Sequence, residues 1–304
     1  YRYGTACPQE QVDFETVLKK DLAKAGNEKR FAKDKKFWDD QLDALGEPLY
    51  SDIQGPSVLE GARKRHGDPK LRASDIEMNE LFVAVKDYHL EPYATQNLMD
   101  FCMNHQLSMT NLLLLGIRTY LSKVNNGQED ITIQNFISRR STHDEWTSGG
   151  SRTIMFPCRT VISPETDFLS AAYEIQNMQN RIYMHSNYDP ALIVDEMRKR
   201  YHTPEHTSYE SCYLTYQPMP VKVENEMLGT VRQHAKWFAN GAATKKMYLT
   251  VSHTEDGGMN FSYHYQTAHL EEHDMELLYY YMMRILFKGI AEPDMSIGEI
   301  MEQV

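Results

Sequence analysis

Residues 245–265, which read KKMYLTVSHTEDGGMNFSYHY, carry the strongest fold signal in the chain. Apolar residues alternate with polar or small ones on either side of the Glu-Asp-Gly-Gly run at 255–258. This period of two is typical of half-buried strands. Glycines tolerate the positive φ angles that tight hairpin turns require. The stretch is therefore predicted to be a β-hairpin.

The same stretch comes close to the His-His-x-x-x-Asp-Gly loop of a large acyltransferase class, in which the second histidine serves the attacking amine or hydroxyl. His253 precedes Asp256-Gly257, but the spacing differs by one residue and Ser252 takes the place of the first histidine. The chain contains no pair of adjacent histidines. We therefore prefer the hairpin interpretation and assign no catalytic residue to these 304 residues.

The composition is that of a soluble globular protein, with 41% hydrophobic and 25% charged residues. A net charge of −11 and the lack of a basic stripe argue against a nucleic-acid partner. The longest apolar run, residues 112–117, is too short to cross a bilayer, so no membrane partner is expected. The four cysteines are widely spaced, which favours reduced, buried thiols in a cytoplasmic protein over a disulfide or zinc framework.

The order of expected elements predicts a mixed α/β fold, in which a largely antiparallel sheet is flanked by helices. Residues 1–75 form a helical lead-in that ends in a long polar connection (46–74), and residues 76–304 form the body. Helices are expected at 9–25, 28–45, 93–104, 111–124, 167–184, 191–201 and 272–288, with a short one from Ser296. Besides the hairpin, strands are expected at 79–87, 129–138, 152–162, 209–217 and 230–238.

Three other motifs suggest chemistry but have simpler explanations. His269–His273 (HLEEH) matches an inverted zinc-protease pattern, yet Glu271–Asp274 is typical of the acidic first turn of a helix, so no metal is expected. Gly-Gly-Ser at 149–151 lacks the spacing of a nucleophile elbow or a phosphate loop, and a mobile loop is expected there. Arg139 and Arg140 end an apolar strand, where they need an acidic or carbonyl partner unless the strand end is solvated.

Six segments spread along the chain share their order with the motifs of one enzyme family. They are 12–14 (VDF), 36–42 (KFWDDQL), 127–140 (GQEDITIQNFISRR), 150–159 (GSRTIMFPCR), 185–190 (HSNYDP) and 200–217 (RYHTPEHTSYESCYLTYQ). Together they resemble the second half of the condensation domain of nonribosomal peptide synthetases, within the chloramphenicol-acetyltransferase-like superfamily. The resemblance implies that residues 1–304 are the C-terminal lobe of a two-lobed fold. It places the N-terminal lobe, with the catalytic histidine motif, upstream of Tyr1.

In that family, phosphopantetheine arms of peptidyl or acyl carrier proteins bring an acyl thioester and an amine into a tunnel between the lobes. The resemblance implies that no cofactor is bound covalently here, and that the missing lobe and carrier domains are partners. Arg140 matches an arginine that pairs with the motif aspartate, and so predicts a structural salt bridge between the lobes. Ile154 and Ser138 are predicted to line the acyl channel.

This chain departs from the family pattern at several channel positions. Ile154 stands where the family has asparagine, and Gln134, Phe136 and Arg139 replace glycine, proline and glycine. The first hypothesis is an amide-forming condensation lobe that is inactive alone. A coenzyme-A-dependent acyltransferase of the same superfamily is a second hypothesis, and a non-catalytic lobe that only docks carrier proteins is a third.

Overall fold

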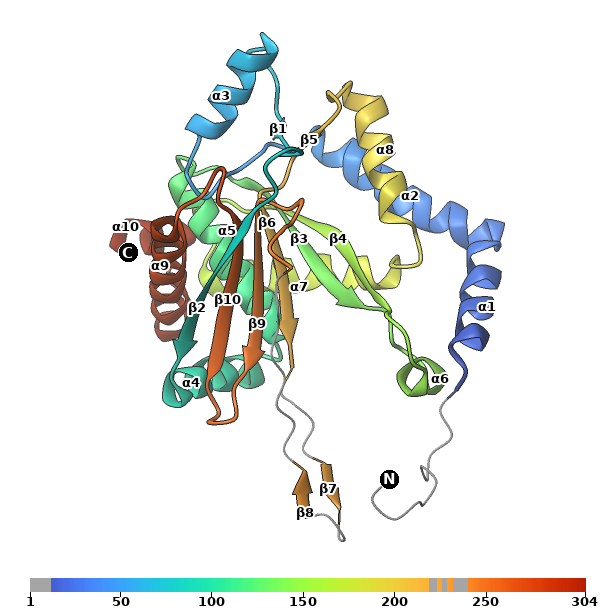
Figure 1. The fold of residues 1–304 in the computed structure, drawn as a ribbon. Coiled ribbons are helices and arrows are strands. Elements are labelled where there is room, and N and C mark those ends of the chain that lie inside the picture. Colours follow the sequence, from blue (N-terminus) through green and yellow to red (C-terminus); the bar gives the residue numbers. More distant parts are fainter. Residues whose placement is uncertain (1–11, 219–222, 226–228, 232–239) are drawn as a thin grey trace.

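The computed structural model describes residues 12–218, 223–225, 229–231 and 240–304, and its centre is a six-stranded sheet (Figure 1). Strand β6 is parallel to both of its neighbours, and the other neighbouring strands are antiparallel. The predicted class, a mixed and largely antiparallel α/β fold, is therefore confirmed. The strand order is β2 (Val83–Leu90), β10 (Met259–Gln266), β9 (Met247–His253), β6 (Cys212–Gln217), β3 (Asp130–Ser138), β4 (Thr153–Val161).

The predicted hairpin is formed by β9 and β10, with Met259 opposite His253 at the turn. The side chain of Asp256 accepts a hydrogen bond from the backbone N–H of Gly258 at 3.0 Å. Gly257 has a φ of 93°, a left-handed conformation that glycine adopts without strain. His253 is the last residue of β9, so it belongs to a strand and not to the turn itself.

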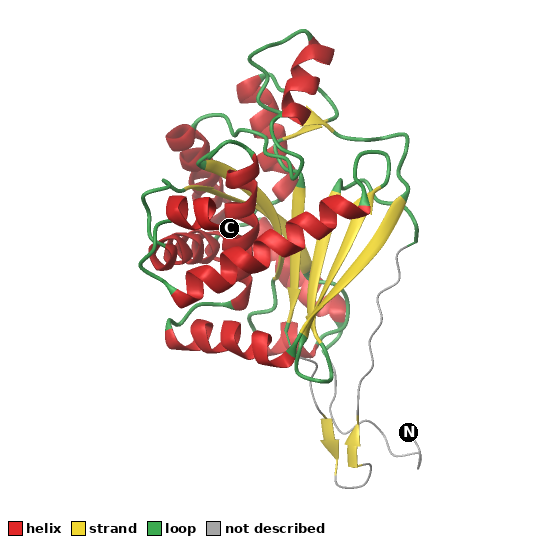
Figure 2. Cartoon of the chain, turned by 90° about the vertical axis from the view of Figure 1, so that its left-hand side faces the viewer, coloured by secondary structure: helices red, strands yellow, loops and turns green. Residues whose placement is uncertain are grey.

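Helices cover one face of this sheet (Figure 2). Helix α5 is buried along most of its length, and Gly116 lets α9 approach it closely, because an added Cβ would lie 3.0 Å from Leu286. None of the helices in the described part of the chain is long and apolar enough to cross a membrane. The helices of this layer are α4 (Pro92–Asn104), α5 (Met109–Val124), α7 (Phe168–Met184), α9 (Glu272–Ala291) and α10 (Ile297–Gln303).

The β4 edge of the sheet is covered by α2 (Glu28–Leu45) and α8 (Pro190–Tyr201), as Figure 1 shows. The indole of Trp38 stacks on the ring of Phe156 with 5.6 Å between centroids. Arg200 of α8 forms an ion pair with Asp39 of α2 at 3.0 Å. These contacts hold the lead-in helix against the body.

Several predicted boundaries were wrong. The first helix, α1, spans Phe14–Ala25, because the carboxylate of Asp13 caps its N-terminus, and residues 9–11 lie outside the described part. The strand expected at 79–87 runs from Val83 to Leu90. The strand expected at 230–238 is described only as β8 (Gly229–Val231), which pairs with β7 (Val223–Asn225), while 232–238 lie outside the described residues.

Two short helices occur where connections were expected. Helix α3 (Ser57–His66) lies within the connection 46–74 and buries only Leu59 and Ala62, so it leaves no apolar stripe in the sequence. Helix α6 (His143–Thr147) is a single turn that follows β3 and is fixed by a capping box between Thr142 and Glu145. A two-stranded ribbon, β1 (Ser74–Asp75) with β5 (Thr207–Ser208), was also not expected.

Candidate functional site

Helices cover one face of the sheet, as Figure 2 shows. On the opposite face, three strands contribute rings that lie in a row. We call Phe136 of β3, Tyr248 of β9 and His264 of β10 the aromatic row. The ring of Phe136 lies 5.3 Å from that of Tyr248, and Tyr248 lies 6.3 Å from the imidazole of His264, both edge to face. The register supports a shared face, since Tyr248 lies opposite His264 on β10 and opposite Tyr213 on β6.

Polar groups along this face are partly engaged with one another. The hydroxyl of Tyr248 lies 2.7 Å from that of Thr215, and the hydroxyl of Ser262 lies 3.4 Å from Nε2 of His264. Burial lowers the pKa of His264 below its ordinary value, and the negative charge of the nearby Asp87 offsets only part of this effect. The imidazole is therefore neutral at pH 7, and it can both donate and accept a hydrogen bond.

Arg140 lies at the end of this face, just beyond β3, and its guanidinium binds backbone carbonyls. It donates to the carbonyl oxygens of Glu145, of Ser148 at 3.1 Å and of Gly150 at 2.7 Å. Of the two alternatives for Arg140, an acidic or carbonyl partner and a solvated strand end, the structure shows carbonyl partners. These hydrogen bonds hold the loop at 148–151 against Arg140. The interlobe salt bridge assigned to Arg140 stays a prediction.

A buried network of ion pairs joins the α6 loop to α1 and to Arg152. The guanidinium of Arg152 binds Asp21 of α1 at 2.6 Å and Glu145 at 3.2 Å, and Lys24 binds Glu145 at 3.2 Å. The Glu145 side chain is only 5% exposed, which by itself raises its pKa. Hydrogen bonds from Ser141, Lys24 and the backbone outweigh the burial and lower the pKa of Glu145 to about 2. The carboxylate is therefore charged at neutral pH and fixes α1 to the end of β3.

The two residues predicted to line the acyl channel lie on opposite faces of the sheet. Ile154 pairs with the buried Ile137 and packs against the core beneath the helices. Ser138, next in β3, is exposed and pairs with Thr153. Since successive side chains of a strand alternate between faces, Ser138 shares its face with the aromatic row and Ile154 does not.

The remaining histidine motifs lie elsewhere. The Nε2 atom of His253 lies 2.7 Å from the hydroxyl of Tyr216, and burial lowers the pKa of His253. The two ends of the zinc-like pattern bind separate acids: His269 pairs with Glu77 at 3.0 Å, and His273 with Glu276 at 3.3 Å. Within the described residues no cluster of three or more metal-ligating side chains occurs.

Sequence reasoning noted Phe136 only as a departure from a family motif and missed Tyr248 and His264 as site residues. The alternation of the hairpin does assign Tyr248 and His264 to the polar face, so a signal existed for two members of the row. It could not show that β6 would bring β3 beside the hairpin, because that neighbourhood depends on the parallel pairings of β6.

Comparison with known families assigns the chain. The condensation domain model matches residues 2–302, which is nearly the whole sequence. The chain belongs to the condensation domain family, and this confirms the resemblance drawn from its six motifs.

Two curated relatives come from peptide synthetases of Bacillus subtilis (strain 168). The chain is 20% identical to a plipastatin synthase over 273 residues, which is 89% of this chain and 10% of that protein. It is 21% identical to a surfactin synthase over 274 residues, which is 90% of this chain and 7% of that protein. The chain thus spans a tenth or less of the length of these relatives.

Solved structures of the same fold extend beyond this chain. The first condensation domain of the calcium-dependent antibiotic synthetase, in complex with a substrate analogue, matches with a TM-score of 0.72 and 15% identity. The match covers 98% of this chain and 59% of that one. VibH, a nonribosomal peptide synthetase condensation enzyme, matches with a TM-score of 0.66 and 12% identity over 99% of this chain and 64% of VibH.

Proposed function

We propose that this chain is the C-terminal lobe of a condensation domain whose parent protein forms an amide or ester bond. The substrates would be an acyl thioester and an amine or hydroxyl acceptor carried on the phosphopantetheine arms of carrier-protein domains, in a cytoplasmic synthetase or a freestanding relative. The main support is the part of the sheet face that carries the aromatic row, where Phe136, Tyr248 and His264 are only half-buried. The chain covers 59% of a solved condensation domain, and in this proposal a second lobe lies against that part of the face.

In this proposal, Arg140 links the two lobes. Its two terminal nitrogens already hold the α6 loop through three carbonyls. Its Nε–H donates to no group of the described residues, and we assign this donor to an upstream aspartate. The network of Arg152, Glu145 and Asp21 keeps that loop in place. The lobe contributes position and channel surface, while the proton-handling histidine belongs to the other lobe.

A condensation assay on the isolated chain tests the first part. The chain is mixed with an acyl-loaded carrier protein and an amine acceptor, and the product is followed by mass spectrometry. We expect no condensation and no thioester hydrolysis above a buffer control. Turnover by the isolated chain would contradict the proposal that the catalytic histidine lies elsewhere.

The second part is tested in the complete parent protein. Arg140→Ala is expected to lower the condensation rate at least tenfold, because one charged hydrogen-bond partner contributes roughly 1.5–3 kcal/mol. Arg198→Ala, which removes an exposed guanidinium on α8, serves as the matched control. If Arg140→Ala leaves both folding and condensation unchanged, the interlobe role is wrong.

A docking lobe without catalysis is the second candidate, and Phe136 favours it. The family has a proline at this position, and here a bulky ring reaches Tyr248 across the face where the channel would run. A parent protein that binds loaded carrier protein but forms no product would support this candidate. Acceptance of coenzyme A thioesters in place of carrier-bound ones would instead indicate the coenzyme-A-dependent acyltransferase.

A further inference from the structure

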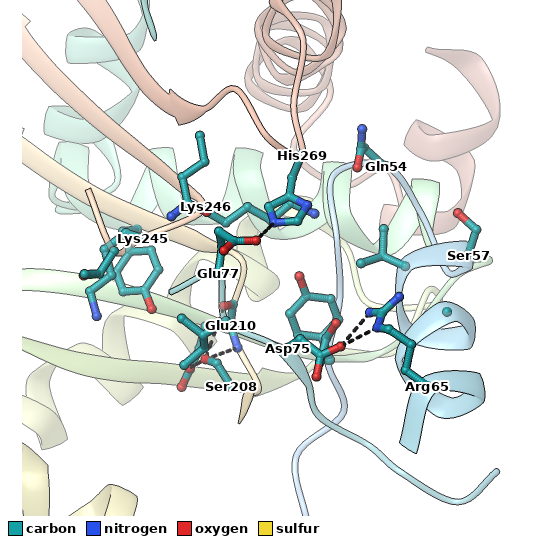
Figure 3. A pocket seen from close by; sticks show the side chains of 18 of the residues that line it. Gln54, Ser57, Arg65, Asp75, Glu77, Ser208, Glu210, Lys245, Lys246 and His269 are labelled. Carbon is teal, nitrogen blue, oxygen red and sulfur yellow. Dashed lines mark hydrogen bonds and ion pairs between the residues drawn. The ribbon is translucent and has the colours of Figure 1, made fainter. Parts of the chain in front are cut away.

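A cavity of about 750 Å³ lies between α3 and the sheet, at the end where β9 begins (Figure 3). Its walls come from α3, from β1 and β5, and from the segment that leads into β9. A volume of 300–1,000 Å³ is typical of sites for small molecules. Its wall includes Ser208, Glu210 and Tyr213 of the segment 200–217 and no residue of the aromatic row.

The carboxylates of the wall already have partners within the protein, as the dashed lines of Figure 3 show for several of them. Asp75 binds Arg65 at 2.6 Å and His66 at 2.6 Å. Glu77 binds His269 at 3.0 Å, and Glu210 accepts hydrogen bonds from Gln134 and Ser208. Asp75 and Glu77 therefore have basic side chains as partners, whereas the partners of Glu210 are neutral.

The two lysines of the wall differ in this respect. Lys246 forms an ion pair with the fully buried Asp52 at 2.6 Å. Lys245 extends over the ring of Tyr213, with its Nζ 4.9 Å from the ring centroid, and no carboxylate of the described residues lies within ion-pair distance of it. Its three N–H donors leave capacity for an anionic group.

Two features of α3 bear on the ligand, the basic character of its last turn and a glycine in the cavity wall. Although the chain has a net charge of −11, this turn carries Arg63, Lys64, Arg65 and His66, of which Arg65 and His66 line the cavity and bind Asp75. Gly61 lines the cavity in the middle of this helix, where glycine costs about 1 kcal/mol relative to alanine. A Cβ there would meet only the flexible end of Arg65, at 3.2 Å, so the glycine keeps the wall open.

We infer that this cavity binds a small molecule with a phosphate or carboxylate group, and that Lys245 holds that group. The cavity adjoins the face proposed for condensation, because its wall residue Tyr213 lies opposite Tyr248 of the aromatic row. Strands β3, β6 and β9 are parallel to one another, so Lys245, just before β9, lies at the end of the sheet opposite to Arg140, just after β3. Binding of an anion by Lys245 is measured on this chain alone and requires no condensation activity, so the inference does not depend on the proposed function.

Titration calorimetry at low ionic strength tests the site, with inorganic phosphate and citrate as probes. Saturable binding of at least one probe is expected, and Lys245→Ala should weaken it about tenfold or more, since a charge-assisted hydrogen bond contributes roughly 1.5–3 kcal/mol. Lys199→Ala removes an exposed charge on α8 and should leave binding unchanged. Binding of phosphate alone or of citrate alone would show which acid group the site accepts.

A second pair of variants tests the cavity itself. Gly61→Phe fills the space beside α3 and should abolish binding, whereas Gly61→Ala should retain it and raise the unfolding temperature. Circular dichroism checks that each variant is folded. The inference is overturned if neither probe binds saturably, or if either Lys245→Ala or the folded Gly61→Phe variant binds as tightly as the unaltered chain.

Discussion

Glu145 joins several segments at the end of β3 through its hydrogen bonds and ion pairs. Its carboxylate accepts from Ser141 and Thr142, and it binds Lys24 and Arg152 while almost fully buried. The folded state holds its pKa at about 2, below its ordinary value of 4.5. A carboxyl group whose pKa is lowered by folding stabilises the fold at every pH above its ordinary pKa, and this stabilisation is lost as the pH falls toward 2.

Glu145→Gln is therefore predicted to lower the free energy of unfolding by up to about 3 kcal/mol at pH 7. The difference from the unaltered chain should shrink as the pH falls from 4.5 toward 2. Urea unfolding at several pH values measures it. Glu15→Gln, at an exposed position, is the control and should show little change at any pH. A difference that stayed constant down to about pH 2 would mean that Glu145 is not held as a carboxylate.

The buried cysteines give a prediction about reactivity. Burial raises the pKa of the Cys158 thiol to about 11 and those of Cys102 and Cys212 to about 12. The thiolate is the reacting form, so these side chains should be almost inert at about pH 8. In a Cys7→Ser background, a thiol-specific disulfide reagent should react with fewer than one thiol per native chain and with three after denaturation. Rapid labelling of the native chain would contradict this burial.

Among the elements, the β9–β10 hairpin depends on a second glycine next to the one with the positive φ. A Cβ on Gly258 would lie 2.5 Å from the carbonyl oxygen of Leu90 on the neighbouring β2, where backbone cannot yield. Gly258→Ala is therefore predicted to destabilise the chain by roughly 1–3 kcal/mol. Gly149→Ala is the matched control, because nothing lies within 4 Å of its added Cβ. Equal midpoints of urea unfolding for the two variants would show that the hairpin tolerates the extra atom.

Local signals predicted the elements well where each element carries its own pattern. The hairpin alternates with period two, and helices α5 and α8 begin after Ser108 and Asp189, which are residue types that commonly cap helix N-termini. Helices α3 and α6 were missed because they are short and bury too few apolar residues to show a period. Such helices form through their contacts with the rest of the chain.

The candidate site was less predictable, because its residues meet through distant pairings. Arg152 and Asp21 are separated by 131 positions in the sequence, and nothing near either residue indicates the other. Arg140 was noted because it ends an apolar strand, but its interlobe role was predicted only because that strand resembles a motif of a known family. The split of Ser138 and Ile154 between two faces follows from alternation along strands, once the register of β3 and β4 is known.

At the scale of the whole molecule, the central sheet has one face covered by helices and one face with the aromatic row. Substitutions at two adjacent residues of β3 test this difference between the faces. Phe136 lies on the open face and is half-buried, whereas Ile137 lies beneath the helices and is 1% exposed.

Phe136→Asp is predicted to lower the free energy of unfolding of this chain by only about 1–2 kcal/mol, because it removes a half-buried ring and its edge-to-face contact with Tyr248. Ile137→Asp places a charge in the core and should destabilise the chain by more than about 4 kcal/mol. Urea unfolding compares the two variants. In the complete parent protein, Phe136→Asp should leave the protein folded. Its condensation rate should nevertheless fall at least tenfold, because the new charge would lie between the lobes. If Phe136→Asp unfolds the isolated chain as Ile137→Asp does, the face is not free. If it leaves condensation by the parent unchanged, the second lobe does not contact the aromatic row.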